Sequence, residues 1–333
     1  MRTILFRCDA NADTGFGHLI RCVNLAKNFG QNQLAKISFV GIYNAFASEI
    51  LSANNFEQVD ISTPLDIDYL CLQDSPKSLI IIDSYAVDND YIRQLAKLQA
   101  KKIYFDDGIS RLDYEEKADA LISLRIDRPL SDFPKAIKLY SGLSYFIAAP
   151  EMHQLREKNL SKLAEHHIQG ISKILIFISG KEEGRAIEKK LLLALDSLGI
   201  ALKVSIIAAH NLYSEFHFSN IELTILEPSN QMHLYLASAD AVISGGGLLK
   251  YEAAYCAIPG AIYSLTELQQ EDTDSFCRMG LAYDLKTDKN ALEAQLFHFI
   301  SDRTIQQSIR QQAQLLFKSY CTQALAKDLL TFI

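Results

Sequence analysis

The chain has little of what marks out several large classes of protein. Its 333 residues include only 7 prolines and 15 glycines, while 49% are hydrophobic, which excludes collagen-like and disordered chains. No apolar stretch approaches the roughly 18 residues that a membrane span requires. With 33 basic against 40 acidic side chains, the chain also lacks the basic surplus that attracts nucleic acid or anionic lipid. We therefore expect a soluble globular protein with no nucleic-acid partner and no stable membrane insertion.

The sequence also lacks several signatures of metal and nucleophile chemistry. Its six cysteines lie far apart with no Cys-x-x-Cys pair, so we expect free buried thiols and no zinc site. No G-x-S-x-G, H-E-x-x-H or Walker A sequence occurs, which gives no support to serine hydrolases, zincins or P-loop kinases. The first apolar run, residues 4–6, is too short for a secretory signal. A cytoplasmic location, with its reducing conditions, is the expectation.

What is present is an alternation of short apolar runs with segments of helical period, which predicts βαβ units and parallel sheets. Expected strands are 3–7, 36–40, 79–83, 102–105 and 118–122, then 173–179, 203–208, 222–226, 241–244, 260–264 and 282–285. Expected helices are 19–29, 46–53 and 90–99, then 185–197, 231–237, 248–256, 290–299 and 304–317.

This pattern predicts an α/β protein of two Rossmann-like domains. We place the first at 1–150 and the second at 171–333, joined by a polar, helix-prone linker at 151–170. Two such domains facing one another form a cleft at the carboxyl ends of both sheets, where ligands of these folds bind. Candidate functional residues are therefore sought in the loops that follow the strands.

The most informative loop runs from Asp9 to Arg21, directly after the first expected strand. Gly15 and Gly17 allow a tight turn and a close approach of the backbone to a ligand. His18 lies at the start of the next expected helix, and the positive end of a helix disfavours a protonated imidazole. We expect His18 to be uncharged, to point into the cleft and to be able to accept a proton. The alternative is a simple glycine turn with a capping histidine.

A second loop, Gly245-Gly246-Gly247, also lies between an expected strand and an expected helix. Three glycines expose amide groups at the positive end of the helix, an arrangement suited to a diphosphate. Glu252 follows about one and a half turns later, where a carboxylate is suited to accept hydrogen bonds from a ribose. Lys250 and Lys181 are candidates for countercharge, although ordinary surface lysines are the commoner case. The alternative for the glycines is tight packing of the strand against the helix.

Three further segments end expected strands. Ser179 and Gly180 lie where they would line the cleft, although the next acidic residues favour an ordinary turn equally. The segment Asp83-Ser84-Tyr85 faces the ligand end of its sheet. The adjacent carboxylates Asp106-Asp107, followed by glycine, are more typical of a turn or helix cap than of a metal centre.

At these residues the chain resembles the UDP-sugar hydrolases of pseudaminic acid biosynthesis and the wider MurG-like GT-B superfamily. The stretch from Arg7-x-Asp9 through Gly15-x-Gly17-His18 to Arg21 is similar to the family's R-x-D and G-x-G-H-x-x-R motifs. Asp83-x-Tyr85 is similar to its D-x-Y, Asp106-Asp107 to its D-D, and the second glycine loop with Glu252 to its nucleotide loop. The resemblance implies a GT-B fold, a UDP-sugar substrate, no metal or other cofactor, and His18 as the base that activates water to attack C1 with inversion.

The chain departs from the family in its second half. Gly180-Lys181-Glu182-Glu183 replaces a G-G-S-D-P-like loop, and Leu248, Leu249 and Lys250 replace hydroxyl residues. Gln269 and Gln270 occupy the place of an E-N-Q-like turn, where Gln269 is the counterpart of a site asparagine.

Three hypotheses follow for the function of the chain. In the first, the protein is an inverting nucleotide-sugar hydrolase, and Asp83 and Tyr85 position the sugar or the water. In the second it transfers the sugar to an alcohol, and in the third it is a non-catalytic sugar-binding relative.

Overall fold

The fold is described from a computed structural model. The described residues are 2–11, 14–29, 35–106, 112–114, 117–126, 129–135, 137–164, 170–208, 212–213, 216–229, 231–285 and 291–333. The chain divides into two compact units, each treated by itself: an N-terminal unit of Met1–Pro150 with Ser319–Ile333, and a C-terminal unit of Glu151–Lys318.

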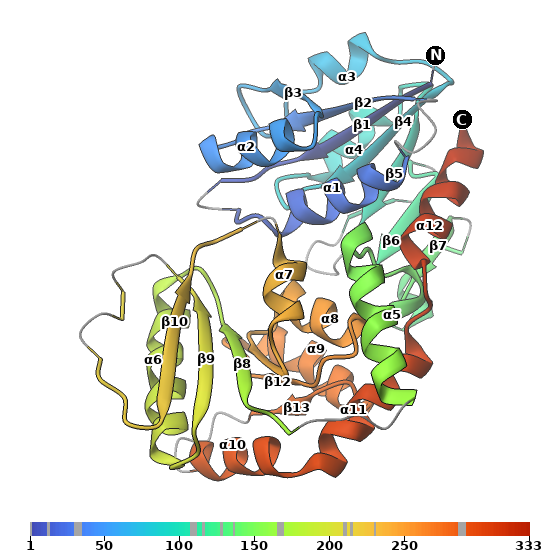
Figure 1. Ribbon diagram of the computed structural model, residues 1–333. Helices are drawn as coiled ribbons and strands as arrows, with labels where there is room; N and C mark the ends of the chain where they lie inside the picture. The colour runs from blue at the N-terminus through green and yellow to red at the C-terminus, as the bar shows by residue number, and fades with distance from the viewer. Residues whose placement is uncertain are drawn as a thin grey trace. The chain divides into compact units, whose positions relative to one another are not determined.

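The N-terminal unit is built on a parallel sheet of seven strands in the order β3-β2-β1-β4-β5-β6-β7 (Figure 1). The strands are β1 (Arg2–Cys8), β2 (Ala35–Gly41), β3 (Glu57–Asp60), β4 (Ser78–Asp83), β5 (Lys101–Phe105), β6 (Ala120–Ser123) and β7 (Lys138–Ser141). Every residue of β4 is buried, as expected for a central strand that is covered on both faces.

Helices cover both faces of this sheet. They are α1 (Gly17–Phe29), α2 (Ala45–Ala53), α3 (Asp68–Leu72), α4 (Asn89–Leu95) and α12 (Cys321–Leu329). One face of the sheet shares a core with α1, α2 and α12, centred on Phe6 and Phe39, whose rings stack 4.9 Å apart. The other face packs against α3 and α4 through residues such as Tyr91 and Leu95. The sheet is therefore doubly wound, as the alternating pattern predicts.

The last 15 residues differ from the prediction, which assigned 171–333 entirely to the second domain. Ser319–Ile333 belongs to the N-terminal unit, where α12 packs on α1 through Leu325 and Leu329. Thr322 Oγ1 accepts a hydrogen bond from the amide of Ala148, and Lys138 pairs with Asp328 at 2.9 Å. The sequence shows an amphipathic terminal segment but not which core it covers.

The C-terminal unit has a six-stranded parallel sheet in the order β10-β9-β8-β11-β12-β13 (Figure 1). The strands are β8 (Lys173–Phe177), β9 (Leu202–Ile207), β10 (Ile221–Leu226), β11 (Ala241–Ser244), β12 (Gly260–Ile262) and β13 (Tyr283–Asp284). The helices are α5 (Pro150–Ala164), α6 (Glu182–Ser197), α7 (Met232–Ala237), α8 (Leu248–Tyr255), α9 (Glu267–Arg278), α10 (Leu292–Ser301) and α11 (Arg303–Leu316). Helices α6 and α10 share one core with this sheet.

Elements that the sequence pattern did not predict are mostly short or peripheral. Strands β3 and β7 are the two edges of the first sheet, where half-exposed residues blur the apolar run. Helix α9 was not predicted because its sequence is rich in charged and polar residues, and α4 ends at Leu95 instead of continuing to residue 99. Helix α5, predicted as part of a linker, belongs to the C-terminal unit.

All six cysteines lie in described ranges and carry free thiols, and four of them are buried as predicted. Cys277 is only partly buried, and Cys71 is exposed because it lies on the outer side of the short helix α3. Over the ranges that the structure describes, no helix is both long and apolar enough to cross a membrane.

Candidate functional site

In the N-terminal unit the candidate residues gather where the strand order reverses. From β1 the chain builds outward through β2 and β3 on one side of the sheet and from β4 onward on the other. The loops after β1 and β4 therefore diverge at the carboxyl edge, which is where doubly wound sheets bind ligands. The first loop leads to His18, the second residue of α1, and the second begins at Asp83 and carries Tyr85.

The turn before α1 has the geometry that its glycines predict. Gly15 adopts a φ of +73°, a conformation that side chains disfavour, and its amide donates to the carbonyl of Asn11 at 2.9 Å. Gly17 is the first residue of α1, and an added Cβ there would meet no atom within 4 Å. There is thus free space next to the backbone at the start of α1, at the position where a side chain of residue 17 would lie.

His18 and Asp83 form a pair across 65 residues of sequence, with His18 Nδ1 2.5 Å from Asp83 Oδ1. The Asp83 side chain is 1% exposed. Burial opposes ionisation of this carboxyl, but the adjacent Arg21 charge and the hydrogen bonds from Arg21 and His18 outweigh it and hold the pKa of Asp83 well below its usual range. An ionised carboxylate only accepts hydrogen bonds, so Nδ1 of His18 carries a proton that it donates to Asp83.

Asp83 is held by three other contacts, which were not predicted. Arg21 donates from Nε to Oδ2 and from its Nη2 to Oδ1, the latter at 2.5 Å. The Cys22 thiol lies 3.6 Å from Oδ2, and burial raises the pKa of this thiol, so it remains a donor. Asp83 is thus enclosed by His18, Arg21 and Cys22, and its predicted role in positioning sugar or water stays a prediction. Arg21, predicted as a ligand-binding residue, faces the same carboxylate.

The His18 ring is more enclosed than expected for a residue pointing into an open cleft. Only 7% of the residue is exposed, because the Tyr85 ring packs on it nearly perpendicularly, with centroids 4.3 Å apart. Tyr85 itself is 52% exposed. The structure thus brings together four of the predicted site residues, His18, Arg21, Asp83 and Tyr85, with Tyr85 as the solvent-facing member.

A second buried pair fixes the loops around this cluster. Arg7 donates to Asp9 at 2.8 Å and to the carbonyl of Pro64, and Asp9 accepts from the amide of Ile42 and from Ser84 Oγ. The loops after β1, β2, β3 and β4 are therefore tied to one ion pair. Only the resemblance pointed to Arg7 and Asp9, since nothing local in the sequence joins them to Ser84.

Of the predicted pair at the end of β5, Asp106 is buried and Asp107 lies outside the described residues. The amide of Asp106 donates to the carbonyl of Ile122 at 2.9 Å, which continues the ladder toward β6. Within the described ranges, no group of three or more His, Cys, Asp and Glu side chains is placed to hold a metal ion. That the reaction needs no metal stays a prediction.

The glycine loop of the C-terminal unit lies at the corresponding reversal, between β8 and β11. Gly245 lies against β8, where an added Cβ would be 2.2 Å from the carbonyl oxygen of Ile178. An added Cβ at Gly246 would likewise lie only 2.7 Å from the Cβ of Gln269. Gly247 precedes α8 and has no atom within 4 Å of such a Cβ. The first two glycines therefore allow tight packing, whereas Gly247 is exposed and has room at its Cβ position.

This difference predicts opposite outcomes for two similar substitutions. Gly245→Ala forces the Ile178 carbonyl to move and is expected to lower the free energy of unfolding by about 1–3 kcal/mol. Gly247→Ala has room, and its φ of −84° suits alanine, so its stability is expected to match the parent. Urea unfolding of the two variants checks this, and equal losses in both would contradict it.

Glu252 is buried in α8, with 5% of the residue exposed and no hydrogen-bond partner for its carboxyl among the residues that the structure describes. Burial raises its pKa to about 7 from an ordinary value of 4.5. A buried carboxyl without a donor suits a ligand that brings hydroxyl donors to it, which is the role predicted for Glu252.

The raised pKa of Glu252 makes stability depend on pH. Between about pH 4.5 and pH 7 the unfolded chain has lost this proton and the folded chain has kept it, so stability falls as the pH rises through that window. Glu252→Gln is therefore expected to match the parent at pH 4.5 and to exceed it by about 2–3 kcal/mol at pH 8. Urea unfolding at both pH values checks this, with exposed Glu183→Gln as control. An equal gain at both pH values would contradict it.

Lys250 does not supply countercharge to a ligand. Its ammonium group is buried and lies 2.5 Å from Asp272 on α9, and the Tyr251 hydroxyl donates to the same carboxylate at 2.9 Å. The predicted alternatives, a phosphate contact or a surface lysine, are both wrong. The sequence did not predict α9, and therefore did not indicate that Asp272 lies beside Lys250. This cluster fixes α8 against α9 instead.

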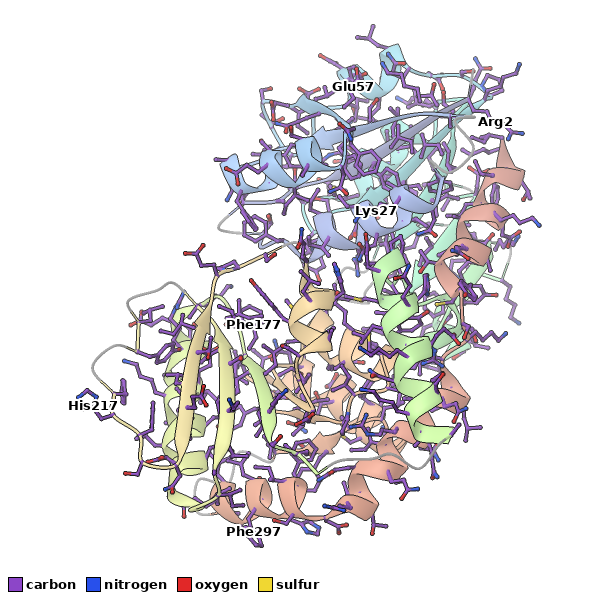
Figure 2. All side chains as sticks on the ribbon, viewed as in Figure 1. Arg2, Lys27, Glu57, Phe177, His217 and Phe297 are labelled. Atoms are coloured by element: carbon purple, nitrogen blue, oxygen red, sulfur yellow. The ribbon has the colours of Figure 1, made fainter. Side chains whose placement is uncertain are left out.

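The loop after β8 is held mainly by a residue that sequence reasoning missed. Ser179 Oγ accepts from the amide of Lys181 at 3.0 Å, and Gly180 is exposed. Glu188 of α6 is buried and accepts from the amide of Ile178 and from the hydroxyl of Tyr213. Burial raises the pKa of Glu188 although both donors act against it. Glu188 therefore holds the end of β8 in place through a hydrogen bond to the residue after it. Figure 2 labels Phe177, the last residue of β8.

Gln269 and Gln270 lie in the first turn of α9, capped by Thr266. The Gln269 side chain packs against Gly246, and its Oε1 accepts from the amide of Leu265 at 2.9 Å. Gln270 donates to Asp274 at 2.7 Å. The structure thus brings Gln269 to the glycine loop, while Gln270 is bound to an acid of its own helix.

Comparison with known proteins gives distant relatives. No protein-family model matches the chain. The chain is 21% identical over 81% of its length to the uncharacterized protein MJ1062 of Methanocaldococcus jannaschii. It is 26% identical over 48% of its length to a UDP-2,4-diacetamido-2,4,6-trideoxy-beta-L-altropyranose hydrolase of Campylobacter jejuni. It spans little more than half of these relatives, 57% and 56% respectively.

Solved structures resemble it over almost its whole length. MurG of Acinetobacter baumannii matches with a TM-score of 0.67 at 14% identity, over 99% of this chain and 100% of that one. The UDP-GlcNAc 2-epimerase of Neisseria meningitidis, bound to UDP-GlcNAc, matches with a TM-score of 0.66 at 12% identity, over 99% and 100%. Together with the two doubly wound parallel sheets, these likenesses show that the chain has the GT-B fold of nucleotide-sugar glycosyltransferases and epimerases.

Proposed function

We propose that the protein is an inverting, metal-independent hydrolase of a UDP-activated diacetamido-trideoxy sugar, which releases the free sugar and UDP in nonulosonic acid or surface polysaccharide biosynthesis. The observation that carries this proposal is the His18–Asp83 pair at the strand reversal of the N-terminal unit. A buried carboxylate that fixes one ring nitrogen as a donor leaves the other able to take a proton from water.

The chemistry assigns each group a single task. His18 Nε2 accepts a proton from water as the water oxygen bonds to C1 of the sugar. The bond from C1 to the diphosphate oxygen breaks at the same time, and UDP leaves with the electron pair. Asp83 keeps the Nδ1 proton in place and stabilises the ring as it becomes positive. Tyr85, half exposed beside the ring, is placed to contact the sugar.

The C-terminal unit would hold the nucleotide. Exposed Gly247 and the positive start of α8 suit the negative charge that develops on the leaving diphosphate. Glu252 lacks a donor in the described part of the chain and would accept hydrogen bonds from ribose hydroxyls. Two comparisons support a UDP-sugar: the C. jejuni relative is a UDP-sugar hydrolase, and S. aureus MnaA, of similar fold, is solved with UDP.

Product analysis tests this function. The protein is incubated with synthesised UDP-diacetamido sugars, with and without an alcohol acceptor, and the products are identified by mass spectrometry in ¹⁸O-labelled water. We expect UDP release without acceptor, one ¹⁸O in the free sugar, and an inverted anomer by immediate NMR. Turnover only with an acceptor would replace hydrolysis by glycosyl transfer. UDP binding without turnover of any donor would favour a non-catalytic relative.

A further inference from the structure

The environment of the His18–Asp83 pair contains a positive charge that the proposed reaction does not use. The Arg21 guanidinium contacts both oxygens of Asp83, and its Nη2 also lies 3.3 Å from His18 Nδ1. The cation stacks on the Phe105 ring, with Cζ 4.5 Å from the centroid. The Arg21 side chain is 10% exposed, so this charge is largely shielded from water and salt.

The charges of this cluster balance only when the imidazole is neutral. Asp83 contributes one negative charge and Arg21 one positive charge, while Cys22 remains a thiol. A carboxylate alone next to a histidine favours the protonated ring. Arg21 opposes that effect twice, because it neutralises the carboxylate and because it lies close to the ring itself. Tyr85, after β4, is a further titratable group that packs on the ring.

We propose that Arg21 is a positioning residue that fixes the Asp83 carboxylate and keeps the His18 ring uncharged near neutral pH. Its planar fork serves both tasks, since two parallel hydrogen bonds orient the carboxylate and the positive charge disfavours a second one on the ring. The use of the uncharged ring as a base rests on the proposed function. The effect of Arg21 on the protonation of the ring does not depend on that function.

The test measures ring protonation directly. Histidine-labelled protein is titrated by NMR, and the His18 signal among the eight histidines is assigned by its loss in His18→Gln. In Arg21→Gln the ring is expected to take up its proton about one to two pH units higher than in the parent. In Arg21→Lys, which keeps the charge, the midpoint is expected within about half a unit of the parent. A folded Arg21→Gln variant that titrates like the parent would overturn the proposal.

A second comparison covers the case in which Arg21→Gln does not fold. Asp83→Asn and the double variant Arg21→Gln/Asp83→Asn differ only in the Arg21 charge, and the double variant leaves no buried charge unpaired. We expect the ring of Asp83→Asn to take up its proton at least about one unit lower than that of the double variant. Equal midpoints in these two proteins would overturn the proposal as well.

Activity separates this inference from the proposed function. If the protein hydrolyses its substrate, the acid limb of kcat/KM moves in Arg21→Gln by the same amount and in the same direction as the NMR midpoint. A shifted midpoint without hydrolysis in the parent would contradict the function and leave the role of Arg21 standing. Hydrolysis by the parent with an unshifted midpoint in Arg21→Gln would contradict the role of Arg21 and leave the proposed function standing.

Discussion

Replacing His18 with alanine is expected to lower the rate of UDP release by about 10²- to 10⁴-fold, the usual contribution of a positioned general base. Asp83 contacts Nδ1 of His18, so Nε2 is the nitrogen assigned as the base in the proposed reaction, and alanine leaves water without this proton acceptor. UDP binding is expected to persist in calorimetry, since the groups proposed to hold the nucleotide lie in the C-terminal unit. Initial rates of UDP release and a UDP titration measure the two effects.

The control for this variant is His217→Ala, which removes an exposed imidazole of the C-terminal unit (Figure 2). Its turnover and its UDP affinity are expected to equal those of the parent. Undiminished turnover in His18→Ala would show that His18 is not the base. A joint loss of turnover and folding, seen by circular dichroism, would be resolved with His18→Gln, which preserves the size of the side chain.

The second large effect is expected on stability, from Arg156→Ala in the C-terminal unit. Arg156 is 1% exposed on α5 and donates to the carbonyl of Tyr255 at 2.6 Å and to that of Phe317 at 2.7 Å. These carbonyls lie at the ends of α8 and α11, where a positive charge is favourable. The variant leaves them without this donor and opens a cavity, so we expect a loss of about 3–5 kcal/mol.

Thermal unfolding of the C-terminal unit measures this effect, and a loss of that size corresponds to a fall in Tm of roughly 10 °C. Arg156→Lys keeps the charge with fewer donors and is expected to lie between the alanine variant and the parent. Arg93→Ala removes an exposed arginine that pairs with exposed Asp90, and its Tm is expected to stay near the parent's. A fall in Tm no larger than that of Arg93→Ala would contradict the conclusion that Arg156 holds the ends of α8 and α11 against α5.

Arg156 also illustrates what a composition-based domain boundary misses. The segment 151–170 is polar, so its sequence predicts an exposed linker, yet Met152, His153, Leu155 and Arg156 of α5 are buried. A buried cation is indistinguishable from a surface one in a sequence, because its burial depends on carbonyls 99 and 161 residues away. Lys250 was mispredicted for the same reason, since its partner Asp272 lies on a helix that polar residues concealed.

The sequence by itself determined the features that depend on neighbouring residues. Short apolar runs and helical apolar patterns predicted the central strands and most helices, and a glycine after the first strand predicted the turn at Gly15. Backbone conformation and burial of neighbouring residues are local requirements. Only the tertiary structure decided the contacts between distant segments. It joined His18 and Arg21 to Asp83, assigned α12 to the N-terminal unit, and divided the glycine loop into two packing glycines and one open one. These depend on which elements pack together, and that is set by the sum of many weak contacts across the core, which no single motif encodes.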